Sequence, residues 1–241
     1  MRASRRLLGV GLLAAADALH AGEFSVSPIR ADLRPTALSE TITVTNHAKE
    51  RLRVAIRLMA WSQDEQGKDV YTDSADLVYF PRQMDIDPES RKVVRVGLKS
   101  ATGPVERTYR LFIEEIKDGF ATSDQPVVNF NFRFGVPIFV APQSPKDAFE
   151  VLEPDLRQGK VRLAVRNDGN QHVRLTRITV SDGKDFHQDI AGWYSLSGTQ
   201  RQYTADIPAG ICRNAKVLTL SVEGPELKVD RQLHVDPANC A

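Results

Sequence analysis

Side chains suited to catalysis or metal binding are spread along the chain and form no recognised motif. The sequence contains no GxSxG, HExxH or glycine-rich phosphate-binding pattern. Glu114 and Glu115 are adjacent on an expected strand, so their carboxylates leave opposite faces and do not form a catalytic pair. The five histidines lack metal-ligand spacing, and we expect His172 and His187 to be surface or turn residues. We therefore predict no catalytic residue, no metal site and no cofactor.

Two cysteines, Cys212 and Cys240, offer the clearest covalent chemistry. They are the only cysteines, and neither lies in a CxxC motif or near a histidine at metal-ligand spacing, so zinc binding and redox activity are not indicated. In an oxidising compartment, such a pair more often forms a disulfide than two free thiols. Closing this loop would contribute roughly 3–4 kcal/mol of stability in the chain-entropy description. Two buried thiols are the alternative.

A run of alternating large apolar residues points to binding. Val128, Phe130, Phe132 and Phe134 are two positions apart, so all four side chains leave one face of a strand. The positions between them are polar or small, which suits an edge strand. The four side chains either fill the core of their own domain or take part in β-augmentation. In that mode an edge strand pairs with a partner and inserts alternate side chains into its pockets.

The elements that must position these residues are strands. Between residues 24 and 140, seven short alternating segments are separated by turns, as in an immunoglobulin-like sandwich, and the seventh is expected over 127–140. A linker with two prolines, residues 141–146, precedes a second alternating set, in which turns at 167–170 and 181–184 are expected to join antiparallel strands. The sequence therefore predicts an all-β fold: two immunoglobulin-like β-sandwich domains, 22–142 and 143–241, joined by a short Pro-containing linker.

The first 21 residues have the layout of a secretory signal peptide. Three arginines within the first six residues precede an apolar run from Leu7 to Ala16. Small residues then lead to an expected cut after Ala21, with Ala18 as the second choice; a buried N-terminal helix is the alternative reading. We exclude residues 1–21 from the fold and expect the mature protein to be exported.

Composition excludes several classes of protein. The chain has 241 residues, of which 41% are hydrophobic and 26% charged, a globular composition. With 32 basic and 31 acidic residues it lacks the charge expected of a nucleic-acid-binding protein. No apolar run of 18 residues is present, so we predict no stable membrane insertion.

Four segments, in their order and spacing, resemble the periplasmic chaperones of the chaperone–usher pilus pathway. They are Ile29–Leu33, Pro81–Pro88 followed by Val93–Arg95, Leu111–Ile116, and Val128–Phe134 leading into Ile138–Pro142. No one of them is specific alone, and the resemblance as a whole covers nearly all of residues 22–241. The resemblance implies a pilus-assembly chaperone with two immunoglobulin-like domains. Departures from the best-known members point to the archaic branch.

The resemblance also implies partners and a mechanism. A pilin subunit is an incomplete sandwich with exposed edges, and the chaperone caps it by lending its seventh strand before delivery to an outer-membrane usher. Here Val128, Phe130 and Phe132 would fill the pilin groove, with Phe134 as a weaker candidate. The localisation implied is the periplasm.

The family anchors the C-terminal carboxylate of the pilin with a cleft arginine and a lysine. Arg30 matches the arginine, but Pro137 stands at the position of the lysine. We expect Arg110 on the adjacent strand to replace that lysine, with Arg133 as the second choice; a solvated surface arginine is the alternative for Arg110. Ala141 replaces the arginine of the family's closing Arg-Pro pair, so the family's salt bridge to Glu115 is not expected.

Two other classes of function explain less of the sequence than a chaperone does. A secreted immunoglobulin-like adhesion or binding module explains the two domains but not the alternation from Val128 to Phe134. A periplasmic enzyme would need a group of catalytic residues that the sequence does not contain.

Overall fold

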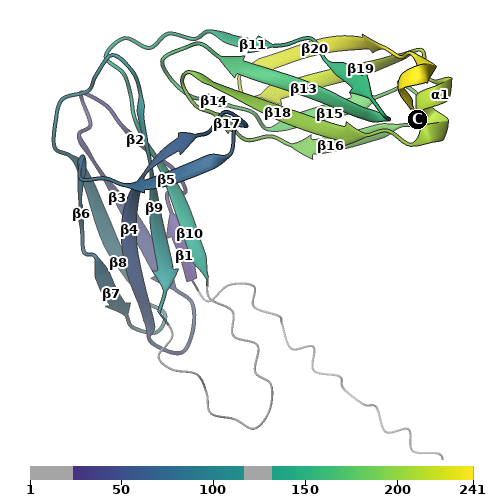
Figure 1. The fold of residues 1–241 in the computed structure, drawn as a ribbon. Coiled ribbons are helices and arrows are strands. Elements are labelled where there is room, and N and C mark those ends of the chain that lie inside the picture. The colour runs from purple at the N-terminus through teal and green to yellow at the C-terminus, as the bar shows by residue number, and fades with distance from the viewer. Residues whose placement is uncertain (1–23, 117–131, 241) are drawn as a thin grey trace, which may run out of the picture.

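The computed structural model describes residues 24–116 and 132–240, and nearly all of its regular structure is β-strand. Figure 1 shows two β-sandwiches joined at a bend. The predicted all-β fold with two immunoglobulin-like sandwiches is confirmed. In the two described ranges, no helix is long and apolar enough to cross a membrane.

Among the described residues, the first sandwich has ten strands in two sheets. They are β1 (Phe24–Ser27), β2 (Ala31–Leu33), β3 (Ser39–Asn46), β4 (Leu52–Gln63), β5 (Asp69–Asp73), β6 (Leu77–Phe80), β7 (Gln83–Ile86), β8 (Arg91–Leu98), β9 (Arg107–Glu115) and β10 (Arg133–Val140). One sheet has the order β1-β3-β8-β6. The other has the order β2-β10-β9-β4-β5, with β7 paired to β4.

Period-two alternation builds the core of this sandwich. Ile42 and Val44 on β3 and Leu111 and Ile113 on β9 are fully buried in one apolar cluster, while the residues between them leave the opposite faces of the two sheets. The strand β5 was not expected from the sequence, because its residues, DVYTD, are mostly polar and none is fully buried. It pairs with the end of β4, and the hairpin β4–β5 reaches toward the second domain (Figure 1).

The second sandwich follows a short connection after β10. Its elements are β11 (Phe149–Val151), β12 (Asp155–Arg157), β13 (Lys160–Asn167), β14 (Val173–Arg174), β15 (Arg177–Ser181), β16 (His187–Ala191), β17 (Tyr194–Ser195), β18 (Thr199–Asp206), α1 (Ala209–Asn214), β19 (Val217–Gly224), β20 (Leu227–His234) and η1 (Pro237–Cys240). Strand β13 pairs with β11, β12 and β18. The opposing sheet has the order β16-β15-β19-β20, and β14 pairs with β17.

The predicted disulfide is present. Cys212 on α1 and Cys240 on η1 are joined with an S–S distance of 1.99 Å, and both residues are buried in the core of the second sandwich. The bridge ties the C-terminal end of the chain to the helix between β18 and β19.

One of the two predicted hairpin turns is wrong. The turn at 181–184 does join antiparallel neighbours, β15 and β16. The turn at 167–170, however, leads from β13 into β14, which pairs with β17 rather than with β13. The reason is the fully buried Asn167, whose Nδ2 donates hydrogen bonds to the carbonyl oxygens of Gln171 and Ser195 and so directs the chain across to β17.

Candidate functional site

Strand β10 has one edge that is only partly paired. Strand β9 pairs with β10 along its whole length, from Arg133 to Val140, whereas β2 pairs with Ile138–Val140 alone. From Arg133 to Pro137, the other edge of β10 has no strand partner in the part of the chain that the structure describes. Such an edge presents free backbone donors and acceptors to a further strand.

The hydrogen bonds at the two ends of β10 show which backbone groups face this open edge. The carbonyl oxygen of Phe132 accepts a hydrogen bond from the N–H of Glu115, on the β9 side, while the N–H of Ala141 donates to Leu33, on the β2 side. Since backbone groups alternate in direction along a strand, the odd-numbered residues face the open edge. Pro137 is one of them, and its missing N–H suits an edge position.

The open half of β10 also carries exposed aromatic side chains. Val136 and Ile138 lie in the core. Phe132 and Phe134 leave the same face of the strand, yet each of these two phenylalanines is 37% exposed. Phe134 contacts Phe24 of β1 edge to face, with 5.0 Å between the ring centroids. The other two residues of the predicted apolar run, at positions 128 and 130, lie outside the described residues, as does the start of the strand expected from position 127.

Arg30 lies where the open edge ends, directly before β2. Its guanidinium donates to both carboxylate oxygens of Asp32, at 2.7 Å from Nη2 and 2.9 Å from Nε, and its Cζ lies 4.8 Å from the ring centroid of Phe139. Burial lowers the pKa of Arg30, but the hydrogen bond and charge of Asp32 outweigh it, so the pKa is raised above its ordinary value. Arg30 is therefore a permanent, partly exposed positive charge with one carboxylate partner.

Arg110 lies on the same face of the sheet, opposite Pro137. It is only 6% exposed, so the alternative of a solvated surface arginine is wrong. Its Cζ lies 4.1 Å from the ring of Trp61 and 5.6 Å from that of Trp193, and its Nη1 donates to the open-edge carbonyl of Gly135 at 3.1 Å. Pro137 lies between Arg30 and Arg110 in the sheet, so the backbones of the two arginines are two strand-to-strand spacings, or about 10 Å, apart.

Arg133 occupies the opposite end of the open edge. It pairs with Glu114 at 2.7 Å and lies over the ring of Phe112, with 3.7 Å between its Cζ and the ring centroid. Four residues along β10 separate it from Pro137, which corresponds to about 13 Å. The structure therefore brings Arg30 and Arg110 together and leaves Arg133 apart from them.

An aromatic cluster at the junction of the two domains supports both of these arginines. Trp61 and Phe139 of the first domain are buried against Leu196 and Tyr194 of the second. The Trp61 and Phe139 rings each lie between 5 and 6 Å from that of Tyr194, at 5.5 Å and 5.3 Å. Nothing in the sequence marked this cluster, because its members are far apart in the chain and each resembles an ordinary core residue.

Hydrogen bonds reinforce the junction. The side chain of Gln63 on β4 donates to the carbonyl oxygen of Tyr194 and accepts from the N–H of Leu196, at 2.8 Å and 3.1 Å. The Trp193 indole N–H donates to Asp69 on β5 at 3.0 Å. These bonds join the hairpin β4–β5 of the first domain to the segment around β17 of the second domain.

His172 is also part of the junction, and its expected surface position is wrong. Its side chain is 9% exposed, its ring stacks on Phe139 at 3.6 Å between centroids, and its Nδ1 lies 2.9 Å from both carboxylate oxygens of Glu106. The burial has a tertiary cause, because Phe139 and Glu106 of the first domain pack against this ring of the second domain. His187, in contrast, is exposed beside Asp189.

The site is therefore suited to binding a chain. It combines an open strand edge, two exposed phenylalanines, and arginines at the cleft end. Within the described ranges, no group of three or more His, Cys, Asp or Glu residues is placed to hold a metal ion.

Comparison with known structures shows a common fold. A chain of the CsuC–CsuE complex, a chaperone and tip adhesion subunit of archaic Csu pili from Acinetobacter baumannii, matches with a TM-score of 0.61 and 19% identity, covering 88% of this chain and 98% of that chain. The Pseudomonas aeruginosa CupB2 chaperone matches with a TM-score of 0.55 and 13% identity, covering 88% and 100%. A chain of the Salmonella enterica SafA pilin–SafB chaperone complex matches with a TM-score of 0.58 and 13% identity, covering 87% and 96%.

Sequence comparison adds the family. A search of curated protein sequences gave no significant match. The N-terminal domain of the pili and flagellar-assembly chaperones of the PapD type, however, matches residues 23–146, which is more than half of the chain and includes β1 to β10. The matched region contains the open edge of β10, Arg30 and Arg110. This chain belongs to the family of pili and flagellar-assembly chaperones.

Proposed function

We propose that this chain is a periplasmic chaperone that binds pilin subunits by strand addition at the open edge of β10 and delivers them to an outer-membrane usher. The observation that carries the proposal is the unpaired edge from Arg133 to Pro137, next to two exposed phenylalanines. Family membership supports the same reading. So do the structurally similar complexes, in which a chaperone is bound to a pilin or a tip adhesion subunit.

The geometry limits how a partner strand can run. A strand added beside residues 133–137 occupies the position in the sheet that β2 takes beside residues 138–140. Because β2 already occupies this position from Ala31 onward, the partner strand must end next to Arg30. If it runs parallel to β10, as β2 does, its C-terminus is the end that meets Arg30. A terminal carboxylate is the group that an arginine binds best, through two parallel hydrogen bonds.

The aromatic face supplies most of the binding free energy. Phe132 and Phe134 leave the same face as the core residues, so in a complex they would enter the core of the partner's incomplete sandwich. Val128 and Phe130 continue the same alternation in the sequence. Complete burial of one such side chain is worth about 1.5–3 kcal/mol. Several of them together would exceed the contribution of the single arginine contact.

Register follows from combining the two parts of the site. With the carboxylate held at Arg30, each residue of β10 meets one position of the partner strand, whereas a slip of one residue turns the wrong face inward. The signal-like segment at residues 1–21 and the disulfide support a periplasmic location. Delivery to an usher is inferred from the family.

The test is recovery of a co-expressed pilin subunit in a pull-down with this chain. We expect Phe132→Ser and Phe130→Ser to abolish recovery while thermal melts show an intact chaperone. Val93→Ser, which changes an exposed apolar residue of β8 in the other sheet, is the matched control and should leave recovery unchanged. Normal recovery with Phe132→Ser and Phe130→Ser combined would contradict the proposal, and so would a loss explained entirely by unfolding.

A further inference from the structure

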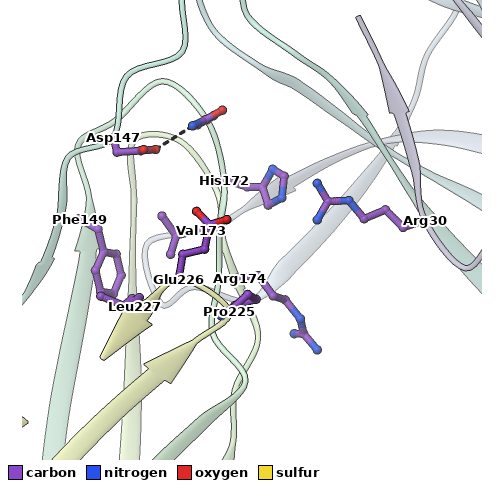
Figure 2. Close-up of a pocket in the computed structure, with 10 residues that line it drawn as sticks. Arg30, Asp147, Phe149, His172, Val173, Arg174, Pro225, Glu226 and Leu227 are labelled. Atoms are coloured by element: carbon purple, nitrogen blue, oxygen red, sulfur yellow. Dashed lines mark hydrogen bonds between the residues drawn. The ribbon is translucent and has the colours of Figure 1, made fainter. Parts of the chain in front are cut away.

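The pocket beside Arg30 does not bring the charged groups of the domain junction together. It has a volume of about 390 Å³ and is lined by residues of both domains. Figure 2 shows Arg174 on its wall, with the guanidinium directed away from Arg30. Polar side chains of the two domains converge instead at Asp69, the first residue of β5, whose side chain is 18% exposed.

Asp69 accepts hydrogen bonds from three neighbours. The side-chain amide of Gln63 on β4 donates to Oδ1, and the hydroxyl of Tyr71 on β5 donates to Oδ2, both at 3.2 Å. The indole N–H of Trp193, from the second domain, donates to Oδ2 at 3.0 Å. The same amide of Gln63 also donates to the carbonyl oxygen of Tyr194 in the second domain. The Asp69 carboxylate is therefore oriented by both domains together.

The negative charge of Asp69 faces the buried arginine of β9. Its Oδ2 lies 3.9 Å from Nη2 of Arg110, and this is the only ion pair of Arg110 among the described residues. The Nε and Nη2 groups of Arg110 are buried without a hydrogen-bond partner. Since water screens a buried pair of charges much less than an exposed pair, the position of the guanidinium depends on its counter-charge. Asp69 therefore helps to fix where the Arg110 side chain lies.

Gly135, in the middle of the open edge, is the backbone group that Arg110 holds. Nη1 of Arg110 donates to the Gly135 carbonyl oxygen at 3.1 Å. A Cβ at this position would lie 3.1 Å from Cε1 of Phe112 and 3.2 Å from Cδ of Arg110, which is tighter than side chains normally pack. Glycine admits both neighbours, but it also has the most backbone freedom to lose when a strand becomes ordered. The hydrogen bond from Arg110 restricts that freedom before a partner arrives.

This hydrogen bond leaves the edge able to accept a strand. Arg110 contacts Trp193 of the second domain, so its donor reaches the Gly135 oxygen from the face of the sheet. An added strand approaches in the plane of the sheet instead. Because a carbonyl oxygen has two lone pairs, one remains for an N–H of the added strand.

We infer that Asp69 is a positioning residue through which the second domain pre-organises the open edge of β10. The inference rests on the proposed function and deepens it. Trp193 and Gln63 hold the Asp69 carboxylate. The charge of this carboxylate holds Arg110, which in turn holds the Gly135 carbonyl. Ordering the edge in advance lowers the entropic cost of adding a strand, so the second domain contributes to capture through the first.

The test follows Gly135 by nuclear magnetic resonance in the free chain. Its carbonyl 13C chemical shift reports the hydrogen bond from Arg110, and its 15N order parameter reports backbone mobility. We expect Arg110→Met to change the shift and to lower the order parameter from the rigid value of about 0.85. Asp69→Asn should change both quantities in the same direction. Trp193→Phe, which removes the indole donor, should do so to a smaller extent.

Capture provides the second measurement, as recovery of a co-expressed pilin subunit per folded chaperone. We expect Asp69→Asn to lower recovery several-fold. In an Arg110→Met background the same substitution should lower it no further, because the connection to the edge is already broken. The matched control is Asp73→Asn, which changes an exposed carboxylate of the same strand that pairs with Arg57. It should leave the Gly135 signals and recovery at their wild-type values.

The outcomes separate this inference from the proposed function. A loss of stability alone would leave the Gly135 signals of the folded chain unchanged, so an unchanged shift in Asp69→Asn would overturn the inference. A full further loss of recovery in the Arg110→Met background would overturn it as well. Neither result bears on strand capture itself. Undiminished recovery with Phe132→Ser and Phe130→Ser combined would instead count against the proposed function, whatever the Gly135 signals show.

Discussion

The two halves of β10 follow one alternating pattern but have different surroundings. Phe134 and Val136 leave the same face, yet Phe134 is 37% exposed and Val136 is 3% exposed. In the second half, residues 138–140, β2 pairs with the edge of β10 and the second domain packs on Phe139. In the first half, residues 133–137, no described strand pairs with this edge and no described residue of the second domain packs on it. The comparison shows that an apolar alternation builds a core where the sheet continues and a binding surface where it stops.

The largest expected effect is on stability, and it separates the two halves directly. Ile138→Ala removes a fully buried side chain and should lower the free energy of unfolding of the first domain by about 2–5 kcal/mol. Phe132→Ser should lower it by less than about 1 kcal/mol, because the side chain is already partly exposed. Urea denaturation measures both. Equal losses would mean that the open half is ordinary core.

The next effect concerns two arginines, Arg110 on β9 and Arg133 on β10. Arg110→Ala removes the contacts of its guanidinium with the Trp61 and Trp193 rings and its hydrogen bond to the Gly135 carbonyl. We therefore expect the free energy of unfolding to fall by about 2 kcal/mol.

Arg133→Ala, the control in the open half, removes an exposed pair with Glu114 and the contact with the Phe112 ring, and should cost about 1 kcal/mol. Thermal melts compare the two variants. A larger loss for Arg133→Ala would contradict the assignment of a buried and an open half.

A smaller effect is expected on capture at the boundary between the halves. Arg30→Ala should weaken binding of a pilin subunit about tenfold, since it removes a charge-assisted contact with the terminal carboxylate. Arg30→Lys should recover only part of the affinity. Pull-downs normalised to folded chaperone provide the measurement. Wild-type capture by Arg30→Ala would show that the open edge works without an anchor at this end.

The smallest effect is a pH dependence confined to the buried half. Tyr109 lies opposite Ile138, and burial, followed by its hydrogen bond to Asp76, raises its pKa to about 12. Because the folded pKa lies above the ordinary value of about 10, this contribution to stability is complete below pH ~10 and is lost as the pH rises toward 12.

The measurement is the free energy of unfolding in urea at mildly and strongly alkaline pH. Tyr109→Phe should decline less with pH than the wild type, although it loses the hydroxyl hydrogen bond at all pH values. An identical decline in the two proteins would show that Tyr109 does not titrate abnormally.

Much of the architecture was predictable because it depends on short-range patterns. Alternation at Ile42 and Val44, or at Leu111 and Ile113, predicts strands whatever they pack against. Cys212 and Cys240 left few alternatives for pairing. The predictions failed where a residue far away in the chain decides the outcome. Asn167 redirects its turn through a bond to Ser195, and the short polar strand β5 exists because the end of β4 pairs with it.

The site shows the same division. The alternation of positions 128 to 134, the place of Arg30 in the first alternating segment and the lack of charge at Pro137 could all be read from the sequence, because these are properties of neighbouring residues. The burial of Arg110, the separation of Arg133 from Arg30 and the packing of His172 from the second domain against Phe139 could be seen only in the folded chain. Burial and charge pairing depend on which segments meet in space. That meeting depends on the packing of Trp61, Phe139 and Tyr194, which come from three separate strands.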